Sequence, residues 1–293
     1  MTKLSLHPSR FGCVLNDVSV SEAEHSYVNI YVRISNSCQA NCRFCEFKNI
    51  GYDIFDIKKF MECIDLVQKE TKINKISFTG GEPTLNIKPL KKCIDYIKNV
   101  DESTFIVVNT NGYNLKELLD IKDIDSISLS RHHYRDDLHR KIMGSNKIPS
   151  SDFIKNIDTS NVHFTCNLIS GYIDNWTDVK KYLEYSADVG VYDVGFVGLM
   201  PVNEYCADHH VDFSDIYKND DKFCIRNKIW KRIQNGVTIC QCNNLLYLPK
   251  KGENVVAFYY RERCKHKEGS VYDRDLYFDG RNLKSEFYGE ILI

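Results

Sequence analysis

The sequence predicts an α/β fold: a partial (β/α)6 barrel of the TIM type, followed by a small α+β extension at the C-terminal end. Strand-like and helix-like segments alternate from residue 28 to about residue 200, which is typical of βα repeats around a parallel sheet. Beyond residue 201 this alternation stops and cysteines reappear. We therefore expect an N-terminal extension over residues 1–27, a barrel over residues 28–201 and a cysteine-rich extension over residues 202–293.

Six strand candidates rich in β-branched and aromatic residues alternate with segments whose apolar residues recur every three or four positions. The strands are expected at residues 28–35, 75–79, 104–109, 126–130, 162–169 and 191–199. The helices between them include residues 56–70, 87–99, 116–121 and 176–187. Six units, in place of the eight of a closed barrel, predict a partial barrel.

Composition limits the classes of function. The number of Lys and Arg residues (39) nearly equals that of Asp and Glu (40), so no basic stripe indicates nucleic-acid binding, and a nucleic-acid partner is not expected. The chain has neither an apolar signal core at its start nor a run of roughly 18 apolar residues, so we expect a cytoplasmic protein without membrane contact. Because cytosolic thiols are kept reduced, the twelve cysteines are expected to be metal ligands or core residues, with Cys63 and Cys93 in the core.

Three cysteines follow the first expected strand on one short loop. Cys38, Cys42 and Cys45 stand in the run CQANCRFC. Three thiolates can hold three corners of an iron–sulfur cube, whereas the usual site supplies four, so one iron is left open to a ligand with its own amine and carboxylate. The same thiolates suit zinc, and this loop alone leaves a zinc site as an alternative.

A second motif follows the second expected strand. Gly80 and Gly81 adjoin Glu82 and Pro83 directly after a β-branched and aromatic segment. Two adjacent glycines let the backbone approach a ligand closely, and the Glu82 carboxylate can receive an ammonium group there. A zinc site does not require such a segment, so the second motif favours the interpretation of the cysteine loop as an iron–sulfur site.

The cysteine loop, with Phe44 before its last cysteine, and the Gly-Gly-Glu-Pro segment one βα unit later together resemble the radical S-adenosylmethionine (SAM) superfamily. The resemblance implies a 4Fe–4S cluster on Cys38, Cys42 and Cys45, and a Gly-Gly-Glu segment that receives the methionine amine of SAM. It also implies an enzyme that cleaves SAM reductively and abstracts hydrogen from a small-molecule or peptide substrate. Such an enzyme takes its electrons from a donor such as flavodoxin or ferredoxin.

In parallel barrels the functional groups lie where the strands end. From the resemblance we expect further cofactor contacts from residues at these ends or beside the motifs: Phe44, Gly80, Gly81, Glu82, Pro83, Asn109, Ser130, Arg131, Asn167 and Val197. Ser130 is the candidate ribose contact, with a helix cap as the alternative. Arg131 is expected to pair either with the cofactor carboxylate or with Asp136 or Asp137.

Several other residues at the expected strand ends have two interpretations. His132 and His133 could transfer a proton or bind substrate, or they could belong to a solvated polar loop. Asn111 and Gly112 are expected to form a turn. No catalytic residue is assigned from the sequence.

Cysteines in the C-terminal extension predict a second metal-binding region, similar to the twitch or SPASM extensions of the superfamily. The candidate ligands of an auxiliary 4Fe–4S cluster are Cys224, Cys240, Cys242 and Cys264, with zinc or no metal as alternatives. Residues 236–248 and 255–260 are expected to form a hairpin beside these thiols.

The ending Leu-Met-Pro of the sixth strand candidate, residues 199–201, resembles the branch of the superfamily that contains the molybdopterin GTP cyclase. That enzyme ends in Gly-Arg-Arg, whereas residues 289–293 read GEILI, so we expect a different reaction. About 27 residues precede the first strand, so a peptide substrate would need a separate recognition partner. The rival interpretations are an iron–sulfur electron carrier, which would not need the Gly80–Pro83 segment, and a zinc-binding interaction module.

Overall fold

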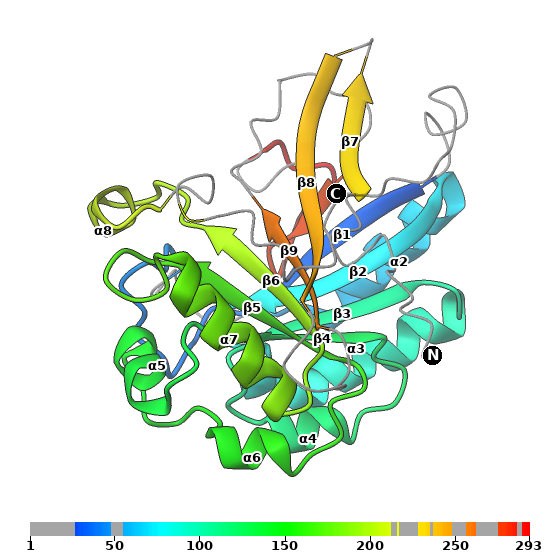
Figure 1. Cartoon of the computed structure of the whole chain (residues 1–293). Coiled ribbons are helices and arrows are strands. Elements are labelled where there is room, and N and C mark those ends of the chain that lie inside the picture. The colour runs from blue at the N-terminus through cyan, green and yellow to red at the C-terminus, as the bar shows by residue number, and fades with distance from the viewer. Residues whose placement is uncertain are drawn as a thin grey trace.

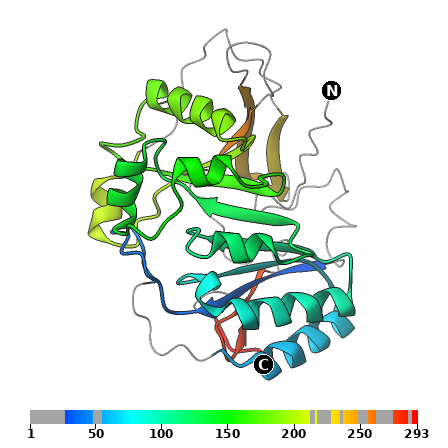
Figure 2. The same cartoon turned by 90° about the horizontal axis from the view of Figure 1, so that it is seen from below.

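The structure is a computed structural model that describes residues 27–47, 55–211, 216, 228–234, 237–247, 256–261, 275–285 and 289–293. Within these ranges the strands form one curved sheet, and helices cover its outer face (Figures 1 and 2). The strand order is β11-β10-β1-β2-β3-β4-β5-β6-β9-β8-β7, which leaves the sheet open at both ends. The predicted α/β fold with a partial barrel is therefore confirmed.

Six parallel strands in chain order form the centre of the sheet. They are β1 (Tyr27–Ser35), β2 (Lys72–Gly80), β3 (Phe105–Thr110), β4 (Ser126–Ser130), β5 (Val162–Leu168) and β6 (Asp193–Gly198). Each corresponds to one predicted strand. Their side chains are almost continuously buried, as expected for a parallel sheet covered by helices.

Helices and a 3-10 turn lie between these strands, and one further helix, α8, follows β6. They are α2 (Ile57–Glu70), η2 (Pro83–Asn86), α3 (Ile87–Val100), α4 (Leu115–Leu119), α5 (Asp136–Met143), α6 (Ser151–Lys155), α7 (Trp176–Asp188) and α8 (Glu204–Asp208). The Asp56 side chain accepts from the N–H of Lys59 at 3.0 Å and so caps the start of α2. Cys63 of α2 and Cys93 of α3 face the sheet and are at most 1% exposed, which confirms that they are core residues.

Strands of the predicted extension join both edges of the central sheet. The additional strands are β7 (Lys228–Gln234), β8 (Val237–Tyr247), β9 (Val256–Arg261), β10 (Asp275–Phe278) and β11 (Leu283–Lys284). β9 pairs in parallel with β6, and β10 pairs in parallel with β1. The predicted hairpin is confirmed as β8 and β9, while β7, which extends it, was not predicted; β7 and β8 rise from the sheet in Figure 1.

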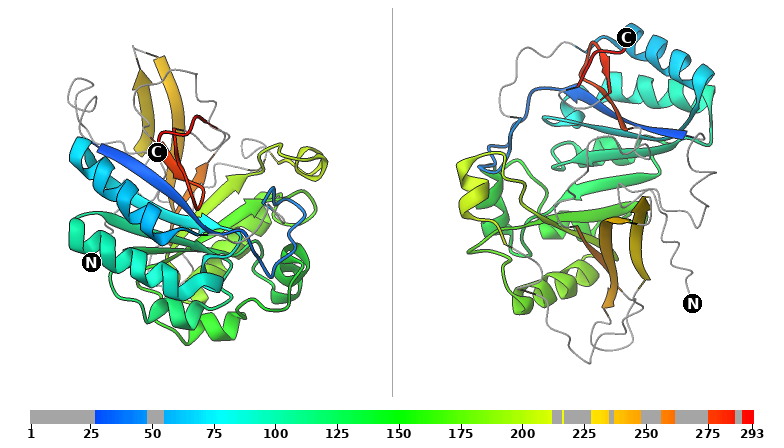
Figure 3. Two further views of the ribbon diagram at one scale, coloured as in Figure 1. Left: turned by 180° about the vertical axis from the view of Figure 1, so that it is seen from behind. Right: turned by 90° about the horizontal axis from the view of Figure 1, so that it is seen from above.

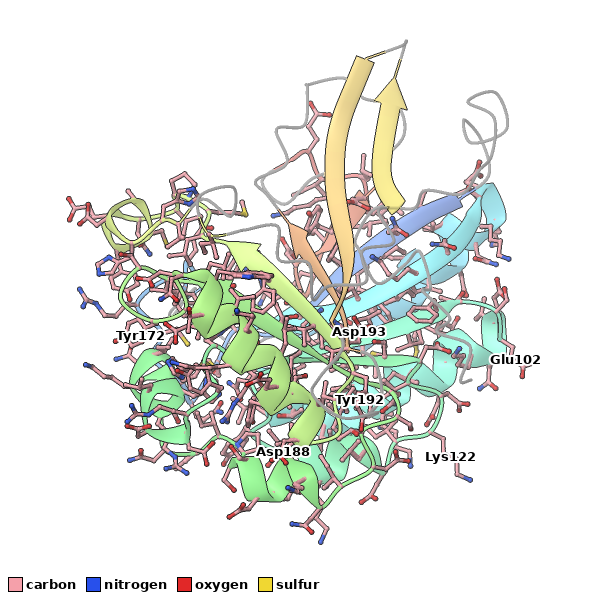
Figure 4. All side chains as sticks on the ribbon, in the orientation of Figure 1. Glu102, Lys122, Tyr172, Asp188, Tyr192 and Asp193 are labelled. Atoms are coloured by element: carbon pink, nitrogen blue, oxygen red, sulfur yellow. The ribbon has the colours of Figure 1, made fainter. Side chains whose placement is uncertain are left out.

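The carboxyl ends of the central strands lie at one edge of the sheet. Tyr172, in the connection after β5, lies at this edge. Glu102 and Lys122, which precede β3 and β4, and Asp193, the first residue of β6, lie away from it (Figure 4). In parallel sheets this edge carries the functional loops. Among the helices of the described ranges, none has both the length and the apolar character needed to cross a membrane.

Candidate cluster and cofactor site

The cysteine loop follows β1 and lies against the C-terminal end of α5. The backbone N–H of Asn41 donates to the carbonyl oxygen of Met143 at 2.8 Å. Gly144 ends the helix at φ +58°, and a Cβ at this position would lie 2.8 Å from the carbonyl oxygen of Asn41. Glycine therefore serves both the left-handed helix end and the close approach of the loop.

Backbone amides face two of the three loop sulfurs. Cys38 is exposed, Cys45 is half-buried and Cys42 is buried. The N–H of Ala40 lies 3.4 Å from Cys38 Sγ, and the N–H of Phe47 lies 3.4 Å from Cys45 Sγ. Although the residue as a whole is exposed, partial desolvation raises the pKa of the Cys38 thiol, so binding of iron must release a proton there.

The donor set of the loop suits an iron–sulfur cube. Within the described ranges, no three Cys, His, Asp or Glu side chains converge on the position of one metal ion. A cube does not require such convergence, because each thiolate binds a different iron. Hydrogen bonds from N–H groups to cysteine sulfurs are also among the features that set the properties of iron–sulfur clusters. Three thiolates on one loop therefore suit a cube with one iron open to SAM.

The glycine pair after β2 packs directly against the stem of the cysteine loop. The N–H of Gly81 donates to the carbonyl oxygen of Ser35 at 2.7 Å, and the N–H of Glu82 donates to that of Ser37 at 2.8 Å. A Cβ on Gly80 would lie 2.2 Å from the Ser35 oxygen, and a Cβ on Gly81 would lie 2.2 Å from the Ser37 oxygen. The two glycines thus let their backbone contact the backbone of Ser35 and Ser37. The sequence indicated a close approach to a ligand and did not indicate this contact within the chain.

Replacing Gly81 by alanine is expected to prevent assembly of the cluster, because the new methyl group would displace Ser37 and with it the loop. Iron and sulfide content after anaerobic reconstitution measures this loss. Gly171→Ala is the matched control, since Gly171 has φ +83° but no atom within 4 Å of an added Cβ, and it introduces strain without collision. Wild-type iron content in Gly81→Ala would contradict the expectation.

Glu82 is buried, at 1% exposure, and accepts four hydrogen bonds. Its Oε1 accepts from the Thr84 N–H at 3.0 Å, the Thr84 hydroxyl at 2.7 Å and the Thr110 hydroxyl at 2.6 Å. Its Oε2 accepts from the N–H of Asn111 at 2.7 Å, which leaves this oxygen with further acceptor capacity. Burial raises the pKa of Glu82, and the hydrogen bonds oppose that shift.

Asn111 joins Glu82 to the cysteine loop. Its Nδ2 donates to Cys38 Sγ at 3.4 Å, and its Oδ1 accepts from Gln39 Nε2 at 2.8 Å. The predicted turn is present, since Gly112 has φ +87°. Asn111 forms this turn and also contacts Cys38, a candidate cluster ligand. The dipeptide Asn-Gly predicts the turn but not the contact.

The structure at the end of β4 bears on the alternative roles of Ser130 and Arg131. Ser130 does not cap a helix, because α5 begins at Asp136 with Arg135 as its N-cap, so its hydroxyl stays the candidate ribose contact. Arg131 is 1% exposed; its guanidinium forms a salt bridge with Asp136 and donates to the carbonyl oxygen of Pro149 at 3.3 Å. The alternative pairing of Arg131 with Asp136 is thus present, and its contact with a cofactor carboxylate stays a prediction.

Three histidines after β4 are buried and neutral. Burial lowers the pKa of His132 to about 3 and that of His133 to about 4, and it holds the pKa of His139 well below its usual value. The solvated-loop interpretation of His132 and His133 is therefore wrong. His132 Nδ1 accepts from the N–H of Asn167 at 3.1 Å, which places the proton on Nε2, and its ring centre lies 5.0 Å from that of Phe44.

The other expected cofactor residues lie at the same edge of the sheet. Asn109 donates to the Ser77 hydroxyl at 2.8 Å and so ties β3 to β2. Asn167 and Val197 are register partners at the ends of β5 and β6. Pro83 is buried and begins η2. Their contacts with SAM stay predictions.

Helix α8, which the sequence did not predict, packs against the cysteine loop. Cys206 Sγ lies 3.4 Å from the carbonyl oxygen of Phe44, and Asn203 Nδ2 donates to that of Arg43 at 3.3 Å. The Arg43 guanidinium lies 4.4 Å from the centre of the Tyr205 ring. Figure 3 shows the blue loop beside this yellow-green helix. Cys206 is therefore part of the support of the loop.

The second candidate metal region falls only partly within the described residues. Cys224 and Cys264 lie outside them. Cys240 and Cys242 are two positions apart on β8. The auxiliary cluster stays a prediction.

Sequence comparison identifies relatives along most of the chain. The family model of the Radical SAM superfamily matches residues 32–186. A probable GTP 3',8-cyclase of Saccharolobus islandicus is 27% identical over 235 residues, which cover 76% of this chain and 70% of the relative. A putative glycyl-radical enzyme activating enzyme of Methanocaldococcus jannaschii is 30% identical over 106 residues, 36% of this chain and 40% of the relative.

The fold is similar to that of SuiB from Streptococcus suis. One SuiB structure has a TM-score of 0.58 at 11% identity and covers 91% of this chain and 62% of that chain. The SuiB structure with bound SAM has a TM-score of 0.51 at 14% identity and covers 64% and 44%. The matched region thus spans less than two thirds of SuiB. The family match includes the three loop cysteines and the Gly80–Glu82 segment. This chain belongs to the radical SAM superfamily and is an enzyme whose cofactors are a 4Fe–4S cluster and SAM.

Proposed function

We propose that this enzyme modifies a small molecule or a peptide by hydrogen abstraction at the carboxyl edge of its sheet. The observation that carries the proposal is the pair of contacts made by Asn111, to Cys38 Sγ at 3.4 Å and to Glu82 Oε2 at 2.7 Å. These contacts join the candidate cluster loop to the carboxylate expected to receive the SAM amine. The two motifs thus form one site.

Held by Cys38, Cys42 and Cys45, the cluster would supply the electron for reductive cleavage of SAM, and SAM would supply the radical that takes a hydrogen atom from the substrate. The chain's own residues position the reactants. Glu82 Oε2 would accept a hydrogen bond from the cofactor amine, and the Ser130 hydroxyl would bond to the ribose. Phe44 packs beside Ile169 and Leu199, and this apolar cluster excludes water from the region next to the loop.

The relatives support two substrate classes. One is named as a GTP cyclase, and SuiB has been crystallised with the precursor peptide SuiA. We include both a small molecule and a peptide in the proposal, with flavodoxin or ferredoxin as the electron donor. A reducing cytoplasm would keep the cysteine thiols of the chain reduced, and Cys224, Cys240, Cys242 and Cys264 are proposed to hold an auxiliary cluster.

Anaerobically reconstituted protein, reduced with dithionite and given SAM, is expected to release 5'-deoxyadenosine and methionine. Deuterium-labelled candidate substrates, nucleotides in one set and peptides in another, then report the substrate class by deuterium in the released nucleoside. A protein that holds the cluster but releases no 5'-deoxyadenosine would support the electron carrier. A zinc-bound protein without a visible absorption band would support the zinc module.

A further inference from the structure

Asn111 presents its side-chain amide nitrogen to the sulfur of Cys38. The distance from Nδ2 to Sγ is 3.4 Å, and Asn111 is 6% exposed. The orientation of the amide is fixed by Tyr113, whose backbone N–H lies 3.1 Å from Oδ1. Because a backbone N–H can only donate, the oxygen must face Tyr113 and the nitrogen must face the sulfur.

The position of Asn111 is fixed from both sides. Its backbone N–H donates to Glu82 Oε2 at 2.7 Å, and its Oδ1 accepts from Gln39 Nε2 at 2.8 Å. The neighbouring Thr110 hydroxyl donates to Glu82 Oε1 at 2.6 Å and accepts from the N–H of Gly112 at 2.9 Å. The amide is therefore held in place before any cluster is bound.

An N–H group that donates to a cysteine sulfur stabilises the more negative, reduced form of an iron–sulfur cluster more than the oxidised form. Cys38 Sγ has two such donors, the Ala40 backbone and the Asn111 side chain. The backbone donor is intrinsic to the loop fold, whereas the Asn111 donor is set by a side chain of another loop.

We propose that Asn111 is a positioning residue that raises the reduction potential of the cluster through its hydrogen bond to Cys38. The inference rests on the proposed function, because it requires a cluster on Cys38. The electron enters the cluster from the reduced flavodoxin or ferredoxin, or from dithionite in vitro. Asn111 neither gains nor loses an electron or a proton in this step.

The test is a redox titration of the reconstituted protein, followed by the electron paramagnetic resonance signal of the reduced cluster. Asn111→Leu removes the N–H donor without adding charge, and Asn111→Asp retains the acceptor oxygen but places a second oxygen toward the sulfur. We expect this hydrogen bond to be stronger with the reduced than with the oxidised cluster, by a difference of about tenfold in the equilibrium for reduction. For one electron, the midpoint potential of each variant should become more negative by about 59 mV.

Asn114 provides the matched control. Its Nδ2 donates to the carbonyl oxygen of Thr84 at 2.9 Å, on the same turn but not to a sulfur. Asn114→Leu and Asn114→Asp should therefore keep the wild-type potential.

The inference would be overturned if both Asn111 variants kept the wild-type potential, or if their shifts were matched by the Asn114 variants. Loss of the cluster from both Asn111 variants, with the Asn114 variants intact, would also overturn it, since Asn111 would then act on loop folding alone. Failure of the wild-type protein to bind a cluster would instead refute the proposed function.

Discussion

Replacing Cys42 by alanine is expected to abolish the formation of 5'-deoxyadenosine. Cys42 is the buried member of the three loop cysteines, its sulfur lies 3.6 Å from Met143 Sδ, and its loss leaves only two loop thiolates for the cube. Chromatography of the nucleoside released under dithionite measures the result, and the expected signal is that of the sample without enzyme.

Cys93→Ala is the matched control for this change. Cys93 lies in α3 and is fully buried in the core, so its loss removes a thiol without touching the loop. This variant should form 5'-deoxyadenosine at the wild-type rate. Undiminished formation by Cys42→Ala would refute the assignment of the loop as the cluster site.

Replacing Glu82 by alanine is expected to weaken SAM binding while the cluster persists. The carboxylate is the proposed amine acceptor, but it also holds the N–H groups of Thr84 and Asn111. Leaving these two buried donors unpaired should lower the free energy of unfolding by about 3 kcal/mol. Calorimetric titration with SAM and urea unfolding measure the two effects separately.

Thr110→Val separates the two roles of Glu82. It removes one donor to Oε1 and leaves Oε2 and its Asn111 partner in place. This variant should be less stable than wild type but bind SAM with similar affinity. If Thr110→Val and Glu82→Ala lost affinity equally, Glu82 would act on SAM only through the turn. Loss of the cluster from Glu82→Ala would mean that the assignment of Glu82 to SAM binding is wrong.

The pH dependence of stability gives an independent measure of Glu82. Burial raises its pKa above 4.5, so between that value and the higher folded pKa the folded protein binds more protons than the unfolded chain. The contribution of the Glu82 carboxyl to the free energy of unfolding therefore falls as the pH rises from 4.5 through its folded pKa. The lowered pKa values of His132 and His133 act in the opposite direction, toward greater stability with rising pH up to about 6.5. The difference between wild type and Glu82→Gln isolates the Glu82 contribution.

Hydrophobic periodicity predicted the six central strands because they are long, apolar and rich in β-branched residues. It also predicted α2, α3, α4 and α7, whose buried faces recur at helical spacing. It missed α5, because this helix has eight residues and buries His139 beside Ile142 and Met143. A histidine in a polar segment carries no apolar signal, and the buried His139 ring lies against His132, which follows β4.

Both motifs of the site were found because their residue types are chemically distinctive. The residues that support them were not, because their roles arise from contacts between distant segments. Asn111 meets Cys38 across 73 positions, and Cys206 meets Phe44 across 162 positions. Likewise, the partner of Arg131 could not be chosen from the sequence, since two carboxylates stood close enough and only the direction of α5 selects Asp136.

The stem of the cysteine loop is fastened by backbone hydrogen bonds from Gly81 and Glu82, and its middle is fastened by Asn41 to the end of α5. The conformational entropy of ordering the binding segment is thus lost when the polypeptide folds, well before iron arrives. The loop is therefore preorganised for the cube. The protein with and without the cluster should have nearly the same backbone conformation and the same resistance to proteolysis.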